Sequence, residues 1–227
     1  MTRVAGKYEL GELLHRGSRY DVLGVEGRDD LVVKLRHPVH DDIEKATVDP
    51  EVTMTTFARS RAVVPIIDFG DTEDRSFIVM ERVRGAMTLA DSLSRIGPLA
   101  PRAALPILYQ FVRGVGDLHR AGIAHRNLRA ENVMLGPNGA RPPRVYLLGL
   151  HASFRERDPA TETDSPTARS AMRADLAAIA PIFSAVVAKE SRPESFDRII
   201  TTIRDFFDAD ALLEHVTRSL LLDAPTT

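Results

Sequence analysis

The feature that most constrains the fold is a change of hydrophobic pattern along the chain. The first part contains short β-rich runs separated by turn residues, at positions 22–25, 31–35, 63–69 and 76–80. A later stripe has the three- and four-residue spacing of one helix face, and consists of Leu105, Leu108, Val112, Val115 and Leu118. This segregation predicts an α+β fold with a β-rich first part, 1–82, and a mainly helical second part, 83–227.

Composition excludes several classes of function. The chain has 227 residues and is 44% hydrophobic, which is enough to bury a sizeable core. A net charge of −2 gives no reason to expect binding to nucleic acid or to a membrane surface. The absence of cysteine rules out disulfides and thiol chemistry. The charged start lacks the apolar core of a secretory signal, and the longest apolar stretch, 176–188, is too short to span a bilayer, so we expect a cytoplasmic protein.

An octapeptide after the helical stripe carries the strongest functional pattern. It reads His125-Arg126-Asn127-Leu128-Arg129-Ala130-Glu131-Asn132 and resembles the catalytic loop H-R-D-L-x-x-x-N of protein kinases. Other kinase motifs precede it in the family's order. Leu31-Val32-Val33-Lys34 is similar to the V-A-I-K strand, and 77–81 resembles the strand that runs into the hinge near 82–86. The chain is therefore identified as protein kinase-like, of the bacterial serine/threonine type, over nearly its whole length.

The resemblance implies a role for each matching residue. Lys34 would hold nucleotide phosphates, Met80 would be the gatekeeper, and Asn132 would hold magnesium. Glu51 would pair with Lys34 from a helix that begins at Asp49-Pro50, where Asp can cap and Pro can open a helix.

The sequence leaves one alternative for the ion pair and indicates three residues with structural roles. Glu44 competes with Glu51 for the pairing role, because the residue one turn after Glu51 is the polar Thr55. His125 and Arg126 would be structural. Asp175 would open a helix and hold the backbone of the catalytic loop.

The positions that carry the family's chemistry depart from its pattern. Asn127 replaces the catalytic aspartate, and a neutral amide cannot accept a proton as a carboxylate does. When Gly149 is aligned with the glycine of D-F-G, Leu147 replaces the acid that holds magnesium and Leu148 replaces the aromatic residue. We therefore expect a cleft that is collapsed and dry around these two leucines.

The phosphate-binding strands also differ from the family. The glycine-rich loop keeps its middle residue, Gly17, whereas His15 and Tyr20 stand in the places of the other two glycines. Tyr20 would place a ring where phosphates lie. Val32 adds bulk at the alanine position over adenine.

These departures predict that the chain is not an enzyme. The favoured interpretation is a pseudokinase, a catalytically inactive kinase-like domain that acts by binding protein, as a scaffold or an allosteric regulator. Two alternatives remain. One is a sensor that binds ATP through Lys34 without magnesium, and the other is an atypical phosphotransferase, including the aminoglycoside-kinase type with its H-x-D-x-x-x-x-N loop. We expect no metal and no required cofactor.

The expected partner is a protein, either an active kinase or an enzyme that the domain regulates. A homo-oligomer is compatible with the sequence, and neither nucleic acid nor membrane is expected. Residues 155–170 are rich in Asp, Glu, Thr, Pro and Ser, which predicts a polar loop open to phosphorylation. About 40 residues follow position 188, against roughly twice that number implied by the family, so we expect a truncated helical lobe with fewer C-terminal helices.

Overall fold

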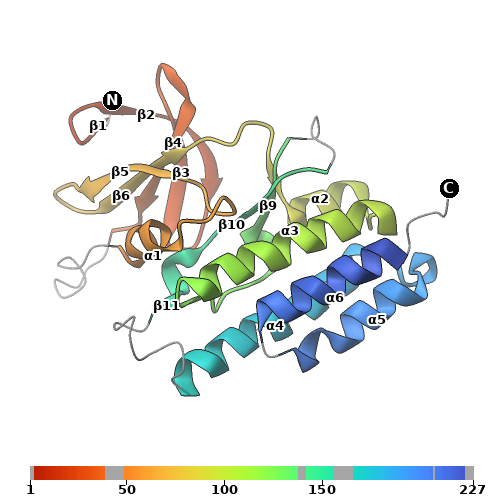
Figure 1. Cartoon of the computed structure of the whole chain (residues 1–227). Helices are drawn as coiled ribbons and strands as arrows, with labels where there is room; N and C mark the ends of the chain where they lie inside the picture. The colour runs from red at the N-terminus through yellow and green to blue at the C-terminus, as the bar shows by residue number, and fades with distance from the viewer. Residues whose placement is uncertain (1–2, 39–48, 138–141, 156–165, 207, 223–227) are drawn as a thin grey trace.

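The computed structural model describes residues 3–38, 49–137, 142–155, 166–206 and 208–222. A β-sheet occupies the N-terminal part, and helices make up most of the C-terminal part (Figure 1). The segment 82–86 connects the last strand of the sheet to the region that follows. The predicted α+β class is confirmed: an antiparallel N-terminal sheet precedes a mostly helical region.

The N-terminal sheet has six strands in the order β1-β2-β3-β4-β6-β5, and every neighbouring pair is antiparallel. Their bounds are β1 Arg3–Val4, β2 Tyr8–Arg16, β3 Tyr20–Val25, β4 Arg28–Arg36, β5 Ile66–Asp71 and β6 Ser76–Glu81. The nine-residue β2 was not predicted, because its polar residues hide the alternation that marks a strand. The predicted turn at 27–30 is shorter than expected, since β4 begins at Arg28.

Helix α1, Pro50–Ala58, lies between the sheet and the helical region (Figure 1). It begins as predicted, because the Asp49 carboxylate accepts a hydrogen bond from the Glu51 amide at 2.9 Å and Pro50 opens the first turn. The competing residue Glu44 lies outside the described residues. Because α1 begins directly after its cap, Glu51 is in the first turn and faces the protein interior.

The described part of the C-terminal region contains five further α-helices and two small sheets. The helices are α2 Leu89–Ile96, α3 Pro101–Arg120, α4 Pro166–Val186, α5 Glu194–Thr202 and α6 Ala209–Leu222. One sheet has the order β10-β9-β7, with β7 Met87–Thr88, β9 Val133–Leu135 and β10 Val145–Leu147. A second small sheet pairs β8, Ile123–Ala124, with β11, Phe154–Arg155. Short 3-10 helices occupy 130–132, 150–152, 189–191 and 203–205.

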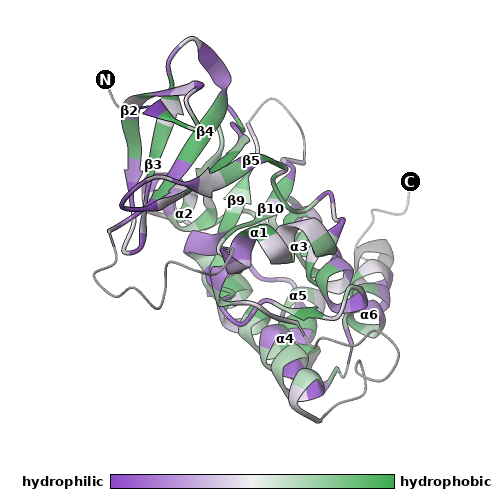
Figure 2. Ribbon diagram, turned by 90° about the vertical axis from the view of Figure 1, so that its left-hand side faces the viewer, coloured by the Kyte–Doolittle hydropathy of each residue, from purple (hydrophilic) through white to green (hydrophobic). Residues whose placement is uncertain are grey.

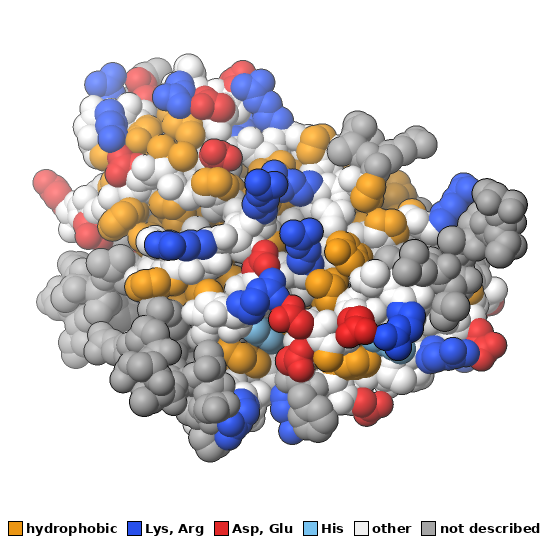
Figure 3. Space-filling view, viewed as in Figure 1, with side chains coloured by type: hydrophobic (Ala, Val, Ile, Leu, Met, Phe, Trp, Pro, Cys, Tyr) orange, Lys and Arg blue, Asp and Glu red, His pale blue; other side chains and the backbone are white. Residues whose placement is uncertain are grey.

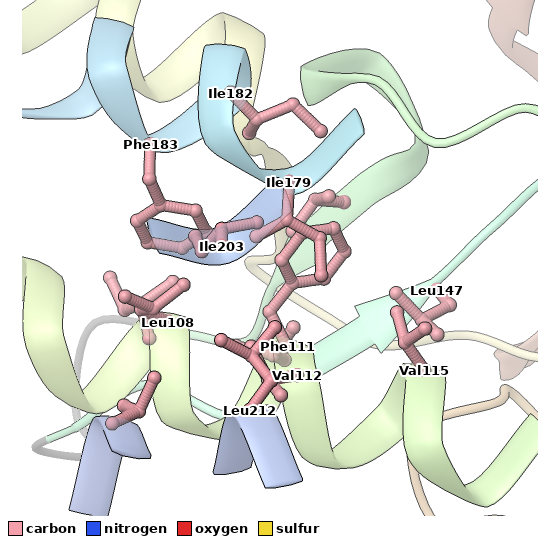
Figure 4. Close-up of a cluster of buried hydrophobic side chains, with 14 of the residues drawn as sticks. Leu108, Phe111, Val112, Val115, Leu147, Ile179, Ile182, Phe183, Ile203 and Leu212 are labelled. Carbon is pink, nitrogen blue, oxygen red and sulfur yellow. The ribbon is translucent and has the colours of Figure 1, made fainter. Parts of the chain in front are cut away.

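The main hydrophobic core lies among the helices. The predicted stripe on α3 is buried along its whole length, and Figure 4 shows Leu108, Phe111 and Val112 facing residues of α4 and α6. In the sheet, green hydrophobic segments occupy much of the strands, with purple hydrophilic ones near several strand ends (Figure 2). A separate small cluster joins α1 to the sheet through Val52, Val64, Ile78 and Met80.

Two expectations about the C-terminal region need correction. The predicted polar loop 155–170 ends earlier, because α4 already begins at Pro166; residues 156–165, with Thr161, Thr163 and Ser165, lie outside the described residues. Asp175 therefore sits inside α4 and does not open a helix. Local composition could not show this, because Pro166 is compatible with both a loop and a first helical turn.

The surface carries both signs of charge. On the face shown in Figure 3, Lys and Arg side chains lie among Asp and Glu side chains, and apolar side chains reach the surface between them. Within the described ranges, no helix is both long enough and apolar enough to cross a membrane.

Candidate functional site in the cleft between sheet and helices

The loop at residues 125–132 is anchored at its start by one buried carboxylate. Asp175 is 2% exposed and accepts hydrogen bonds from the backbone N–H groups of His125, at 2.6 Å, and Arg126, at 2.7 Å. His119 Nε2 lies 3.1 Å from the same carboxylate. Arg126 has a φ of 62°, a left-handed conformation that costs about 1–3 kcal/mol outside glycine. The carboxylate of Asp175 therefore holds a strained turn, which is the anchoring role that the sequence suggested.

His125 is a structural residue of this loop. It is fully buried, its Nε2 lies 3.0 Å from the Leu148 carbonyl oxygen, and its Nδ1 accepts a hydrogen bond from the Asn127 amide at 3.3 Å. Since Nδ1 is the acceptor, Nε2 carries the hydrogen and donates a hydrogen bond to the Leu148 carbonyl oxygen. Burial lowers the pKa of His125, and Asp175 opposes that shift only in part, so the ring is held neutral.

The two asparagines of the loop are linked to each other. Asn132 Nδ2 donates a hydrogen bond to the Asn127 backbone oxygen at 2.7 Å. Arg129, between them, is an exposed residue that pairs with Glu131 at 2.9 Å and lowers the pKa of that carboxyl to about 2. The amide of Asn127 can donate or accept a hydrogen bond, but it carries no anionic oxygen.

Lys34 and Glu51, which were predicted to pair, form an ion pair between β4 and α1. The side chains are 16% and 5% exposed, so solvent screens the pair weakly. The pair joins the sheet to the first turn of α1 and holds that helix inward. Removing one partner from such a buried pair typically costs about 3–5 kcal/mol, because the other charge is stranded.

The residues that were expected to line a nucleotide pocket come together at this junction. Val32 on β4 is opposite Met80 on β6, and both pack with Leu148, Tyr146 and Met134 in the small cluster next to α1. Gly17 lies in the turn between β2 and β3, where its N–H donates to the Tyr20 carbonyl at 2.9 Å. A Cβ on Gly17 would lie 2.9 Å from that same oxygen, so the retained glycine is required by this tight turn.

The segment after β10 has a different register from the one predicted. Leu147 is 1% exposed and belongs to the core of the helical region, where it lies beside Val115 of α3 (Figure 4). Its N–H donates to the Ala62 carbonyl at 2.7 Å. Leu147 is therefore buried among core residues of the helical region, and the alignment that placed it at the acid of D-F-G needs correction.

The residue that faces Asn132 is Gly149. Its φ is 79°, and a Cβ placed on it would lie 3.0 Å from Asn132 Oδ1. In kinases the aspartate of D-F-G and the last asparagine of the catalytic loop hold magnesium ions that bridge the same phosphates, so they must lie close together. By that geometry Gly149 stands in the place of the acid, Leu150 in the place of the aromatic residue, and His151 in the place of the glycine.

The next two residues support this two-residue correction. Leu150 is 1% exposed, as a buried aromatic substitute would be, and the 3-10 turn that it begins packs against α1. The ring of His151 lies 6.2 Å from the ring of Tyr20, centroid to centroid. The alignment of Gly149 with the glycine of D-F-G missed this register, because Gly149 occupies the position of the acid. The signal in the sequence was the uninterrupted apolar run 145–148, which reads as a strand that ends directly before Gly149.

The residues in this corner do not fit a magnesium ion. Gly149 has no side chain to offer, and Asn132 offers a single neutral ligand, its Oδ1, because its Nδ2 donates to the Asn127 backbone oxygen. In the described part of the chain, no group of three or more His, Asp or Glu residues could hold a metal ion. Magnesium favours carboxylates together with phosphate and water oxygens.

Comparison with known proteins identifies the family. The model of the protein kinase domain matches residues 15–166, and the chain belongs to that family. It is 37% identical over 123 residues to the serine/threonine-protein kinase pkn2 of Myxococcus xanthus, covering 54% of this chain and 14% of the relative. It is 32% identical over 135 residues to PknE of Mycobacterium tuberculosis, covering 57% and 24%. It is 29% identical over 142 residues to PrkC of Bacillus subtilis, covering 60% of this chain and 22% of the relative.

These relatives are bacterial proteins named as serine/threonine-protein kinases, and the matched part of the chain spans less than a quarter of each. Their names contradict the prediction, made from Asn127 and Leu147, that the chain is not an enzyme. The family is one of enzymes, and the prediction is corrected accordingly. One step of that prediction was the assignment of Leu147 to the acid of D-F-G, and this step was wrong because Leu147 lies in the core.

Proposed function

We propose that this protein kinase-family domain acts as a regulatory protein-binding domain, a scaffold or allosteric partner, in which the position of α1 is what the partner recognises. The observation that carries the proposal is the Lys34–Glu51 ion pair. It holds α1 against the sheet with residues of the chain itself. A helix fixed in this way presents a constant surface to a protein partner.

Two features of the site support a role for α1. Leu150, directly after Gly149, is buried in a turn that packs against α1, so the helix is held from below as well as from the sheet. The cap residue Asp49, which directly precedes α1, is also buried, with 7% of its surface exposed. The inward position of α1 therefore depends on buried polar contacts, and breaking one of them moves a whole surface element.

A second candidate function is phosphate transfer from ATP to protein, which the names of the relatives favour. The described residues that could take part are Lys34 and Asn132, in their family positions. Neither Asn127 nor Gly149 carries a carboxylate, so this activity would have to differ in its acid and base groups from the family pattern.

The test compares wild type with Lys34→Met and Glu51→Gln. Affinity capture from the native cell, quantified by mass spectrometry, should show a partner that is reduced at least about ten-fold by either variant, the size of effect expected for a coupling of about 1.4 kcal/mol. Glu194→Gln is the matched control, because Glu194 forms an exposed pair with Arg198 on α5. Circular dichroism establishes that each variant is folded.

Incubation with labelled ATP separates the two candidates. A partner retained equally by all variants, together with phosphate transfer that Lys34→Met abolishes, would favour the phosphotransferase. Loss of the partner in both cleft variants but not in the α5 control would support the regulatory domain.

A further inference from the structure

Tyr20 occupies an unusual position for the first residue of β3. It follows the tight turn at Gly17, yet its side chain is directed inward, and the residue is 8% exposed. Its hydroxyl group donates a hydrogen bond to Asp49 Oδ2 at 2.5 Å. A buried tyrosine hydroxyl normally requires such a partner. The hydrogen bond links the turn of the glycine-rich loop to the start of α1.

The Asp49 carboxylate serves two elements at once. Oδ1 caps α1 by accepting the Glu51 N–H, and Oδ2 accepts the hydroxyl of Tyr20. Burial, followed by the hydrogen bond to Asp49, raises the pKa of Tyr20 far above its usual value of 10.0, so the hydroxyl stays a donor at all physiological pH values. The hydroxyl can therefore donate to Asp49 across the physiological pH range.

The ring of Tyr20 also covers the cationic end of the ion pair. Lys34 Nζ lies 4.8 Å from the ring centroid, within the range of a cation–π interaction. On another side the ring approaches that of His151, from the segment after β10. Burial lowers the pKa of His151, which holds this neighbour neutral. Three segments distant in sequence thus meet around one phenol ring.

We infer that Tyr20 is an internal latch: its hydroxyl fixes the start of α1 through Asp49, and its ring excludes anionic ligands such as nucleotide phosphates from Lys34. The inference deepens the proposed function and rests on it for its biological meaning. The latch itself is a property of the isolated chain. It makes the inward position of α1 independent of any bound nucleotide.

Two variants separate the two parts of the latch. Tyr20→Phe keeps the ring and removes the hydroxyl. Hydrogen exchange of the α1 amides at 51–53 should then become about five-fold faster, the effect of losing one hydrogen bond of about 1 kcal/mol. Tyr8→Phe is the matched control, because Tyr8 donates to Asp68 at 3.1 Å within the sheet and should leave these amides unchanged.

Asp49→Ser tests the same link from its other end. Serine can still cap α1, but its shorter side chain does not reach Tyr20. In the double variant Tyr20→Phe with Asp49→Ser, the α1 amides should exchange no more than about two-fold faster than in Asp49→Ser alone. Both substitutions remove the same hydrogen bond, so their effects should not add. Exchange in Tyr20→Phe that stays within about two-fold of wild type, with normal folding, would overturn the latch.

Tyr20→Gly restores the glycine of the family and removes the ring. We expect ATP, added without magnesium and followed by thermal shift and calorimetry, to bind this variant at least about ten-fold more tightly than wild type, and Lys34→Ala to abolish the gain. Equal affinity in both proteins would overturn the excluding role of the ring. These measurements need no partner, so their failure is distinct from failure of the capture experiment on Lys34 and Glu51.

Discussion

Gly149 and Asn132 lie against each other, at the place where kinases hold magnesium. A Cβ on Gly149 would be 3.0 Å from Asn132 Oδ1, whereas Leu147, two residues earlier, is buried in the core against α3. The acid of D-F-G is therefore replaced by a glycine with φ of 79°. This relationship makes a direct prediction about where an aspartate can be introduced.

Gly149→Asp should destabilise the protein less than Leu147→Asp, although the Asn132 side chain, 3.0 Å from the added Cβ, must shift to admit it. Asp adopts the left-handed region at a cost of about 1–2 kcal/mol and would place its carboxylate beside Asn132. A carboxylate at position 147 would be buried without a partner, at a cost of about 3–5 kcal/mol. Urea unfolding measures both. Because the Tyr20 ring covers Lys34, stabilisation by ATP with magnesium, sought by thermal shift, is expected only when Gly149→Asp is combined with Tyr20→Gly. Equal destabilisation by the two single variants would contradict the corrected register.

Asp175→Ala should destabilise the protein strongly. It removes the acceptor of the His125 and Arg126 backbone N–H groups, and each buried N–H without an acceptor costs about 1–3 kcal/mol. Asp208→Ala provides the comparison, because Asp208 accepts the Ala211 amide at 2.7 Å at an exposed helix start, where loss of a cap costs about 1 kcal/mol. Similar unfolding free energies for the two variants would show that Asp175 does not anchor the loop.

Thr55→Val should stabilise the protein. Thr55 Oγ1, on α1, is a buried side-chain oxygen without a hydrogen-bond partner among the described residues. Replacing the hydroxyl with a methyl of similar size removes a desolvation penalty, and we expect a gain of about 1–2 kcal/mol in unfolding free energy.

Thr56→Val is the control for that gain. Its hydroxyl donates to the Val52 carbonyl at 2.8 Å on the exposed side of α1, so the substitution should give no stabilisation. An increase in melting temperature for Thr56→Val equal to that of Thr55→Val would attribute the effect to helix propensity instead.

Stability should fall as the pH drops below about 6.5. His125 is buried and neutral in the folded state with a lowered pKa, while in the unfolded chain it titrates near its usual value of 6.5. Below that pH His125 is protonated in the unfolded state but not in the folded state. The free energy of unfolding therefore falls by up to about 1.4 kcal/mol per pH unit. His151, whose pKa is also lowered by burial, adds to the same trend.

Urea unfolding at pH 7.5 and at pH 5.5 measures this dependence, with both values chosen about one unit either side of the unfolded pKa. His125→Gln should reduce the difference between the two pH values. His15→Gln should leave it unchanged, because His15 is exposed to water on β2. A pH dependence that survives His125→Gln in full would assign the effect to other groups.

Much of the fold was predictable from local signals. β-rich runs between turn residues predicted β3, β4 and β6, the stripe from Leu105 to Leu118 predicted α3, and Asp49-Pro50 predicted the start of α1. These signals are reliable because each depends on residues close together in the chain. β2 and the full extent of α4 were not predicted, because polar residues hide the alternation of β2 and Pro166 is compatible with both a loop and a first helical turn.

The sequence by itself determined the class of fold, the order of the kinase motifs, and the replacement of the catalytic-loop aspartate by Asn127. The tertiary structure alone decided that Gly149 faces Asn132, that Leu147 belongs to the core, and that Tyr20 turns inward to Asp49. The physical reason is the same in each case. Which side of a strand or turn faces the cleft depends on the left-handed backbone at Gly149 and on partners about 17 to 30 residues or more away, and neither is visible in a local pattern.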